Sequence, residues 1–265
     1  MSQDLEGNER MSTTPGRHCG NKASRVVITI LIIVVSAGVG IWTGLMLGGL
    51  RELKTISALR SDPIDLLNLT DRATASDTEF LLMGDSRVAR WDPVPELDSI
   101  PFGLVGSAGM TAVQMELATR VIAPRLAGKT VIVQIGINDL KAIGYMDRDP
   151  DEIISETKRS LTAIHRTLKK NEVRVFVSTI VPPGPVGLSR RPIWDDRIRD
   201  AVVSVNEALV SGHLMAVEDV LDFGRLLGSP RKTDSVFSAD ALHLNRSGYE
   251  VLDACLIERL LKPTG

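Results

Sequence analysis

The stretch Phe80–Ser86 reads FLLMGDS: four apolar residues followed at once by a glycine, an acid and a serine. Four consecutive apolar residues are typical of a strand that is buried on both faces of a sheet. The polar tripeptide then falls at the carboxyl end of that strand, which is where open parallel sheets bind their ligands. The stretch therefore predicts both the first strand of an α/β fold and the place of its functional site.

The same alternation continues along the chain. Apolar runs typical of strands lie between longer segments typical of helices. The expected strands are 80–83, 102–105, 131–135, 173–180 and 214–217, and the expected helices are 111–127, 150–170, 195–210 and 246–262. Near-continuous apolar strands that alternate with helices predict an α/β fold, in which helices cover both faces of a five-stranded parallel sheet.

The composition excludes several classes of function. The 265 residues are enough for one medium domain and an appendage, and the formal net charge of −2 provides no positive field for nucleic acid. We therefore expect no nucleic-acid partner. Two cysteines and four histidines exclude a disulfide scaffold and a four-thiolate zinc site, and they leave little room for a histidine-rich metal centre.

One long apolar segment stands apart from the rest. Residues 26–50 contain no charge, and at about 1.5 Å per residue they are long enough to cross a bilayer core of about 30 Å. A cleaved signal peptide is the rival interpretation, but its apolar region is usually only about 7–15 residues long. The length therefore favours a single uncleaved transmembrane helix.

This segment divides the chain into four parts. We expect a cytoplasmic disordered tail at 1–25, the transmembrane anchor at 26–50, a juxtamembrane connector at 51–77 and a folded domain at 78–265. Basic residues are slightly more numerous before the anchor than after it. By the positive-inside rule this difference predicts a cytoplasmic N-terminus and a folded domain outside the cytoplasm.

Small residues recur within the anchor. Ser36, Gly40, Gly44 and Gly48 follow one another at intervals of four residues, so they share one stripe of a helix where a second helix can pack closely. Glycine is also common in membrane helices that have no partner. A homodimer through this stripe and a glycine content without a partner both remain open.

Polar residues follow the predicted strands at their carboxyl ends. The segments are Gly84–Ser86 after the first strand, Gly106–Gly109 after the second, Gly136–Asp139 after the third and Asp240–His243 after the last. Because the carboxyl ends of parallel strands meet at one edge of a sheet, we expect these four segments to lie together.

Ser86, His243 and Asp240 are the residues that we expect to carry the chemistry. A serine hydroxyl becomes a good nucleophile when an imidazole accepts its proton, and a carboxylate fixes the tautomer of that imidazole. Asp240 lies three residues before His243, so its side chain can reach back to the ring within one loop. The trio predicts nucleophilic acyl transfer. His165 and His213 have no reactive neighbours in the sequence, and we expect them to be structural or surface residues.

Acyl transfer also needs hydrogen-bond donors for the oxyanion that forms on the attacked carbonyl group. The sequence offers the backbone N–H of Ser86, the backbone N–H of Gly109 and the side-chain amide of Asn138. A glycine at 109 also lets the backbone approach a ligand closely. We expect these three donors to form the oxyanion hole.

Together these motifs resemble those of the SGNH hydrolases, also called the GDSL esterase/lipase superfamily. The first block matches Phe80–Ser86 with Ser86 as nucleophile, the second contributes Gly109, the third (GxND) matches Gly136–Asp139, and the fifth (DxxHL) matches Asp240–Leu244. The resemblance covers residues 79 to about 262. It implies a flavodoxin-like three-layer α/β/α fold that uses neither a metal nor an organic cofactor.

The sequence departs from the family's pattern at two points. Arg87 stands where the family often has a small or apolar residue, and the second block lacks the Asn that often precedes its glycines. Both departures affect the substrate pocket more than the triad, so we expect Arg87 to contact the substrate. In the loop 181–194, Arg190 and Arg191 either hold an anionic substrate, such as an acidic glycan or a phospholipid headgroup, or lie in solvent.

The sequence therefore predicts a membrane-anchored serine esterase that hydrolyses acyl esters, such as O-acetyl groups on surface glycans or lipids, through an acyl-enzyme on Ser86. An O-acyltransferase is the alternative: it would use the same residues and pass the acyl group to a sugar hydroxyl instead of water. A non-catalytic binding scaffold would be expected to lack part of the triad, whereas this chain has all three residues.

Overall fold

The computed structural model describes residues 20–59, 71–73, 78–188, 190–191 and 194–261. Contacts within the chain divide it into two units, residues 1–49 and residues 50–265. Most of the predicted tail at 1–25 and much of the predicted connector at 51–77 lie outside the described residues.

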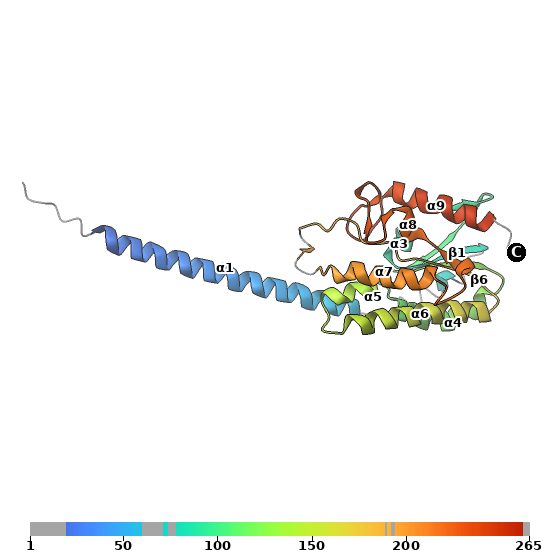
Figure 1. The fold of residues 1–265 in the computed structure, drawn as a ribbon, viewed down its shortest axis with the longest axis horizontal. Helices are drawn as coiled ribbons and strands as arrows, with labels where there is room; N and C mark the ends of the chain where they lie inside the picture. Colours follow the sequence, from blue (N-terminus) through green and yellow to red (C-terminus); the bar gives the residue numbers. More distant parts are fainter. Residues whose placement is uncertain (1–19, 60–70, 74–77, 189, 192–193, 262–265) are drawn as a thin grey trace, which may run out of the picture. The chain divides into compact units, whose positions relative to one another are not determined.

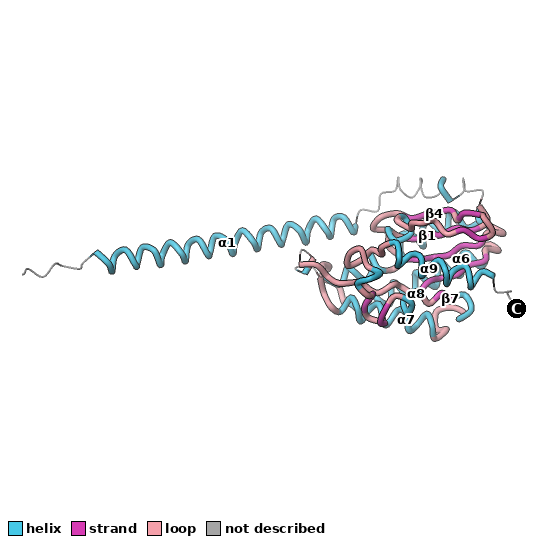
Figure 2. Tube along the Cα trace, turned by 90° about the horizontal axis from the view of Figure 1, so that it is seen from above, coloured by secondary structure: helices cyan, strands magenta, loops and turns pink. Residues whose placement is uncertain are grey.

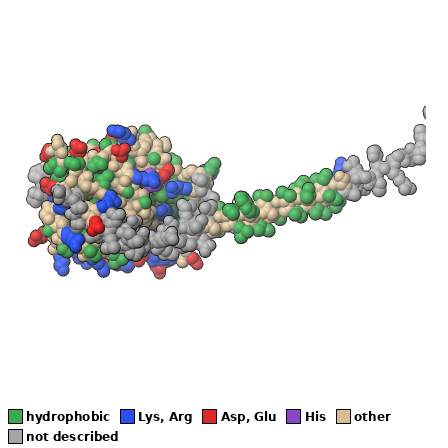
Figure 3. Space-filling model, turned by 180° about the vertical axis from the view of Figure 1, so that it is seen from behind, with side chains coloured by type: hydrophobic (Ala, Val, Ile, Leu, Met, Phe, Trp, Pro, Cys, Tyr) green, Lys and Arg blue, Asp and Glu red, His purple; other side chains and the backbone are tan. Residues whose placement is uncertain are grey.

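The first unit contains most of one long helix, α1 (Gly20–Leu59), whose last ten residues, 50–59, belong to the second unit. Its segment Ser24–Gly49 is apolar and long enough to cross a membrane, either as an anchor or as a signal sequence. The side chains of this segment are exposed all round the helix, for example Leu31 at 62% and Trp42 at 63%, and Figure 3 shows the hydrophobic surface that they form. A helix that is hydrophobic all round and unburied is typical of a membrane environment.

The second unit is built on a five-stranded parallel sheet. Its strands are β1 (Phe80–Gly84), β4 (Gly103–Gly106), β5 (Thr130–Gln134), β6 (Arg174–Ser178) and β7 (Val220–Leu221), and their order is β4-β1-β5-β6-β7. Figure 2 shows β4 and β7 towards opposite edges of the sheet. Counted in chain order, the arrangement is 2-1-3-4-5, the flavodoxin-like order, and the direction of winding reverses between β1 and β5.

Helices cover both faces of this sheet. They are α3 (Ser86–Ala89), α4 (Ala112–Ile122), α5 (Ile137–Leu140), α6 (Pro150–Lys170), α7 (Arg197–Val210), α8 (Phe223–Leu226) and α9 (Arg246–Leu261). Figure 1 shows α8 and α9 on one side of the strands and α4 and α6 on the other. One apolar core joins the sheet to α4, α6 and α7, and a second joins it to α8 and α9. The predicted three-layer α/β/α fold is confirmed.

Successive side chains of β1 enter different cores. Leu81 and Met83 belong to the core beneath α4, α6 and α7, whereas Phe80 and Leu82 belong to the core beneath α8 and α9. Because side chains alternate between the two faces of a strand, a strand that is buried on both faces must be apolar at every position. This requirement explains why the run FLLM forms an interior strand.

The predicted strand at 214–217 is wrong. The fifth strand is β7, which begins three residues after Val217 and pairs with β6 over two residues only. A 3-10 turn, Val217–Asp219, precedes it. Asp219, the last residue before this strand, interrupts the apolar pattern and is nevertheless buried. Its burial is tolerated because its carboxylate pairs with His165 at 2.8 Å and with Lys169 at 3.0 Å.

The segments that connect the main strands and helices contain several short elements. They are the hairpins β2 (Glu96–Leu97) with β3 (Ile100–Pro101) and β8 (Gly228–Ser229) with β9 (Lys232–Thr233), and the further 3-10 helices Ala123–Leu126, Lys141–Gly144 and Ser235–Phe237.

Candidate active site

Ser86 stands at the first position of α3, directly after the carboxyl end of β1. Asp85 caps this short helix by accepting a hydrogen bond from the backbone N–H of Arg87 at 2.9 Å. The helix lies close to the neighbouring strand β4, since a Cβ added to Gly106 would stand 2.3 Å from the backbone nitrogen of Ala89. The glycine is therefore needed for this close approach, and the approach fixes the position of the serine.

A chain of hydrogen bonds links Ser86 to two residues near the C-terminal end of the sequence. Its Oγ lies 3.1 Å from Nε2 of His243, which is 157 positions away in the sequence. Nδ1 of His243 lies 2.8 Å from Oδ2 of Asp240. Oδ1 of Asp240 accepts hydrogen bonds from the backbone N–H groups of Leu242, at 2.7 Å, and of His243, at 3.1 Å. The structure thus brings Ser86, His243 and Asp240 together.

The surroundings of Asp240 favour its ionised form. Burial on its own would raise the pKa of this carboxyl group, but the hydrogen bonds from the His243 ring and from the Leu242 N–H outweigh burial and lower the pKa to about 2. The guanidinium of Arg190, 3.8 Å from Oδ2, adds a positive charge beside it. A carboxylate that stays ionised can hold the proton of a neutral imidazole on Nδ1 and leave Nε2 free to accept one.

The structure places Arg87 inside the protein, which corrects the expectation that it contacts the substrate. The side chain is 2% exposed. Its Nε donates to the carbonyl oxygen of Leu242 at 2.6 Å, and its Nη1 donates to that of Val181 at 2.7 Å. The hydroxyl of Tyr249 donates to the backbone oxygen of Arg87 at 2.9 Å. Arg87 therefore ties the loop that carries His243 to α3.

Gly109 lies in a tight turn after β4. The turn is closed by a hydrogen bond from the backbone N–H of Met110 to the oxygen of Ser107 at 3.3 Å. Gly109 is the third residue of this turn and has a φ of +81°, a value typical of a type II turn, which a glycine adopts without strain.

Asn138 lies in α5, directly after β5, and is buried. Its Nδ2 donates to the carbonyl oxygen of Met110 at 2.9 Å, and its Oδ1 accepts a hydrogen bond from Nζ of Lys141 at 2.8 Å. These two bonds fix the orientation of the amide, and Nδ2 carries a second hydrogen for another acceptor. Since Ser86 and Asn138 follow β1 and β5, they flank the point where the winding of the sheet reverses, which is where such sheets bind ligands.

Asp139, next to Asn138 in α5, connects α5 to α4. Its Oδ2 accepts a hydrogen bond of 2.7 Å from the backbone N–H of Ala112, in the first turn of α4. The pKa of Asp139 is raised to about 7. Burial is the main cause and the nearby charge of Asp85 adds to it, while hydrogen bonds from backbone N–H groups act in the opposite direction. The sequence motif contained Asp139, but nothing in the spacing indicated that it joins two elements.

The geometry agrees with a comparison against families of known proteins. The model of the GDSL-like Lipase/Acylhydrolase family matches residues 83–251, which is more than half of the chain. The chain belongs to this family. Membership of this family supports a hydrolase activity for the chain. The matched residues 83–251 include Ser86, Asn138 and His243.

Solved structures of GDSL-like proteins and their relatives have the same fold. A structure from Streptococcus pneumonia, provisionally described as that of a platelet activating factor, has a TM-score of 0.62 at 17% identity and covers 79% of this chain and 97% of its own. A GDSL-like lipase from Bacteroides thetaiotaomicron has a TM-score of 0.56 at 18% identity, with 74% and 98% covered. The acetyl xylan esterase AlAXEase has a TM-score of 0.52 at 16% identity, with 69% and 99% covered. A comparison with curated protein sequences finds no match.

The other predicted residues make no hydrogen bond with Ser86, His243 or Asp240 among the described residues, although Arg190 lies 3.8 Å from Asp240. Arg191 lines a cavity together with Trp194. His165 pairs with Asp219, which lies 2.8 Å from its Nε2, and this pairing agrees with the expected structural role. His213 bonds to Ser211 at 2.9 Å. Among the described residues, no three His, Cys, Asp or Glu side chains are grouped so that they could hold a metal ion.

Replacing Arg87 tests whether it supports the loop of His243. We expect Arg87→Met to lower the free energy of unfolding by about 2–6 kcal/mol, because two buried carbonyl groups lose their donor and each such loss costs about 1–3 kcal/mol. Thermal unfolding of the chain in detergent measures the effect. Arg90→Met is the matched control, since Arg90 ends the same short helix but is exposed. Equal, small shifts for the two variants would contradict this role of Arg87.

Asp139 should make the stability of the protein fall as the pH rises. Its pKa is about 7 in the folded protein against an ordinary value of 3.8, so between these two values the folded state holds a proton that the unfolded state has lost. Asp139→Asn keeps an acceptor for Ala112 and removes the titration. We expect the variant to gain stability relative to the wild type between pH 4 and pH 8, on the order of 4 kcal/mol in total. Melting temperatures across this range measure the gain. Exposed Asp147→Asn is the control, and parallel curves for wild type and Asp139→Asn would refute the prediction.

Proposed function

We propose that the protein is a serine esterase that hydrolyses acyl esters through an acyl-enzyme on Ser86. The observation that carries the proposal is the hydrogen-bonded chain from Ser86 through His243 to Asp240, with distances of 3.1 and 2.8 Å. A hydroxyl, an imidazole and a carboxylate in this order are the parts that nucleophilic acyl transfer requires.

In the first step, Nε2 of His243 accepts the proton of Ser86 as Oγ attacks the carbonyl carbon of the ester. The carbonyl oxygen becomes an oxyanion, and we assign its stabilisation to the N–H of Ser86, the N–H of Gly109 and the amide of Asn138. The N–H of Ser86 suits this task because it lies in the first turn of α3, where an N–H has no acceptor within the helix.

In the second step, the tetrahedral intermediate collapses to the acyl-enzyme. His243 gives its proton to the oxygen of the leaving alcohol, and the carbon–oxygen bond of the ester breaks. Water then attacks the acyl-enzyme, with His243 again as the base, and releases the acid. The low pKa of Asp240 supports this cycle, because a permanent carboxylate stabilises the imidazolium at each stage.

The acyl group is proposed to be short, as in O-acetyl esters of glycans or lipids. A cavity of about 250 Å³ lies beside Asn138, with Thr111, Ala142 and Tyr145 in its walls. Both polar and apolar side chains line it, and its small volume favours a short acyl chain over a long one.

We further propose that α1 anchors the enzyme in a membrane with the N-terminus in the cytoplasm and the second unit (residues 50–265, the GDSL-like unit) outside it. The apolar, exposed segment Ser24–Gly49 supports the anchor, and the small excess of basic residues before residue 26 supports the orientation.

Two substitutions test the mechanism with p-nitrophenyl acetate as substrate. We expect Ser86→Ala to lower kcat by more than about 10³-fold and to abolish labelling by a fluorophosphonate probe. Asn138→Ala should lower kcat by roughly 10²–10³-fold, because one donor to the oxyanion is lost. Ser155→Ala, an exposed serine on α6, is the control. Undiminished turnover by Ser86→Ala would refute the mechanism, and transfer of the acetyl group to an added glycan in preference to water would assign an acyltransferase.

Reporter fusions test the orientation in a bacterial host. An alkaline phosphatase joined after Gly265 should be active, because that enzyme matures only outside the cytoplasm, and a β-galactosidase at the same place should be inactive. The size of the membrane-bound product on a gel separates an intact anchor from a cleaved signal sequence. The reverse pattern of reporter activities would place the GDSL-like unit in the cytoplasm.

A further inference from the structure

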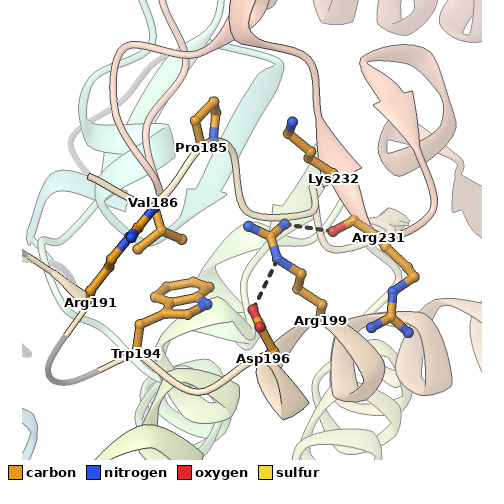
Figure 4. A pocket seen from close by; sticks show the side chains of 8 residues that line it. All are labelled: Pro185, Val186, Arg191, Trp194, Asp196, Arg199, Arg231 and Lys232. Atoms are coloured by element: carbon orange, nitrogen blue, oxygen red, sulfur yellow. Dashed lines mark hydrogen bonds and ion pairs between the residues drawn. The ribbon is translucent and has the colours of Figure 1, made fainter. Parts of the chain in front are cut away.

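A cavity with a volume of about 690 Å³ lies at the start of α7. Its walls come from the loop after β6, the first turn of α7 and the β8–β9 hairpin (Figure 4). The lining residues are Pro185, Val186, Arg191, Trp194, Asp196, Arg199, Arg231 and Lys232. Four of these eight residues are cations and one is an acid, in a chain whose formal net charge is −2.

Arg199 forms the base of the cavity and is fixed in place. Its guanidinium donates to three backbone oxygens: those of Pro183 at 2.8 Å, Arg231 at 2.7 Å and Gly184 at 2.9 Å. It also lies over the ring of Trp194, 5.7 Å from the ring centre, and the side chain is only 14% exposed. These bonds join the loop after β6 to the β8–β9 hairpin, so two walls of the cavity are held in one geometry.

Two cations remain available to a ligand. Arg231 points away from the other lining side chains and pairs with Asp200, and the carboxylate of Asp196 lies 3.7 Å from Arg199 (Figure 4). Arg191 and Lys232 are exposed at the rim of the cavity, and no carboxylate of a described residue lies within ion-pair distance of either. Asp196 offsets part of the charge of Arg199, but Arg191 and Lys232 keep a net positive charge at the cavity, which attracts an anion.

The indole N–H of Trp194 is a hydrogen-bond donor at this cavity that has no acceptor among the described residues. Its Nε1 atom is buried at the wall of the cavity. A buried donor without an acceptor costs free energy, which an oxygen of a bound ligand would recover. The indole also provides a flat apolar surface beside the two cations.

Hydrogen bonds connect the wall of the cavity to the loop of His243. Gly184 accepts the hydrogen bond from Arg199 on the cavity side, and its own N–H donates to Ala241 at 3.0 Å, between Asp240 and His243. Arg190, next to Arg191, lies 3.8 Å from Asp240. The segment 184–191 therefore connects the cavity with the loop that carries Asp240 and His243.

From these contacts we propose that the cavity is an anion subsite, which binds a carboxylate or phosphate group carried by the ester that Ser86 attacks. The inference rests on the proposed esterase function, and it adds the substrate class: esters with a negative charge at some distance from the reacting carbonyl. Arg191 and Lys232 bind the charge, Trp194 covers the adjoining apolar part, and Arg199 positions the walls.

A series of paired esters measures this preference and the reach of the site. The substrates are the O-acetyl esters of glycolate, 3-hydroxypropionate and 4-hydroxybutyrate, which keep a short acyl group and carry the carboxylate in the alcohol part. Each is compared with its neutral methyl ester, and the enzyme is the full chain in neutral detergent. We expect kcat/KM for the anionic member to exceed that of the neutral member by about three- to tenfold at one or more chain lengths, the range expected for one or two exposed ion pairs. The preference should shrink as NaCl rises from about 0.05 to about 0.5 M, because salt screens exposed charges.

Substitutions assign the preference to the cavity. Lys232→Gln and Arg191→Gln should each reduce the anionic-to-neutral ratio by about two- to fivefold, and Lys232→Arg should retain it. Lys170→Gln is the matched control, because Lys170 is an exposed lysine at the far end of α6. Competition by inorganic phosphate and by monomethyl glutarate shows which of the two anions the subsite prefers.

A binding measurement separates failure of the subsite from failure of the esterase. In Ser86→Ala, monomethyl glutarate but not dimethyl glutarate should change the tryptophan fluorescence saturably, and Trp194→Phe should remove the change. If the wild type hydrolyses no ester, the proposed function fails, and this titration alone decides the question of the subsite. Equal kcat/KM values within every pair, or an anionic preference unaffected by Lys232→Gln and Arg191→Gln, would overturn the inference.

Discussion

The guanidinium of Arg87 joins segments of the GDSL-like unit that are distant in the sequence. The residue belongs to α3, next to the proposed nucleophile, and its donors reach Leu242 in the loop of His243 and Val181 beyond β6. A guanidinium carries five N–H donors in a rigid plane, so one side chain can fix two carbonyl groups in a single geometry. Because no strand or helix links Ser86 directly to His243, the 3.1 Å distance between them depends on such bonds.

Holding ionisable groups in the interior has an electrostatic cost. Burial raises the pKa of Asp85 and lowers that of Arg87, and the opposite charge of the partner counteracts both shifts. Asp139, also buried, has a pKa of about 7. Such groups contribute little net stability, and they cluster at sites that do chemistry. Asp85, Arg87 and Asp139 form such a cluster near Ser86. The cluster is consistent with a region whose charges serve a chemical function at the expense of stability.

Local features of the chain were enough to predict most of the fold. The helix at 150–170 was predicted at its observed bounds, because Asp149 caps it, Pro150 suits its first turn and its apolar face is regular. The segment 214–217 misled, because a two-residue strand carries too little pattern to be recognised. The residues that meet around Ser86 were named from strand ends and motifs, whereas the target of Arg87 and the pairing of His165 with Asp219 depend on tertiary packing that no local pattern encodes.

The strands and the cavity walls belong to different parts of the molecule. Ser86 and Asn138 are held by the interior strands β1 and β5, while the cavity is formed by a loop and by the β8–β9 hairpin, neither of which pairs with the main sheet. Insertions, deletions or exchanges of residues in these two outer segments leave the hydrogen bonding of the strands intact. A lineage that carries this architecture can diversify its choice of ester while inheriting the same reaction chemistry unchanged.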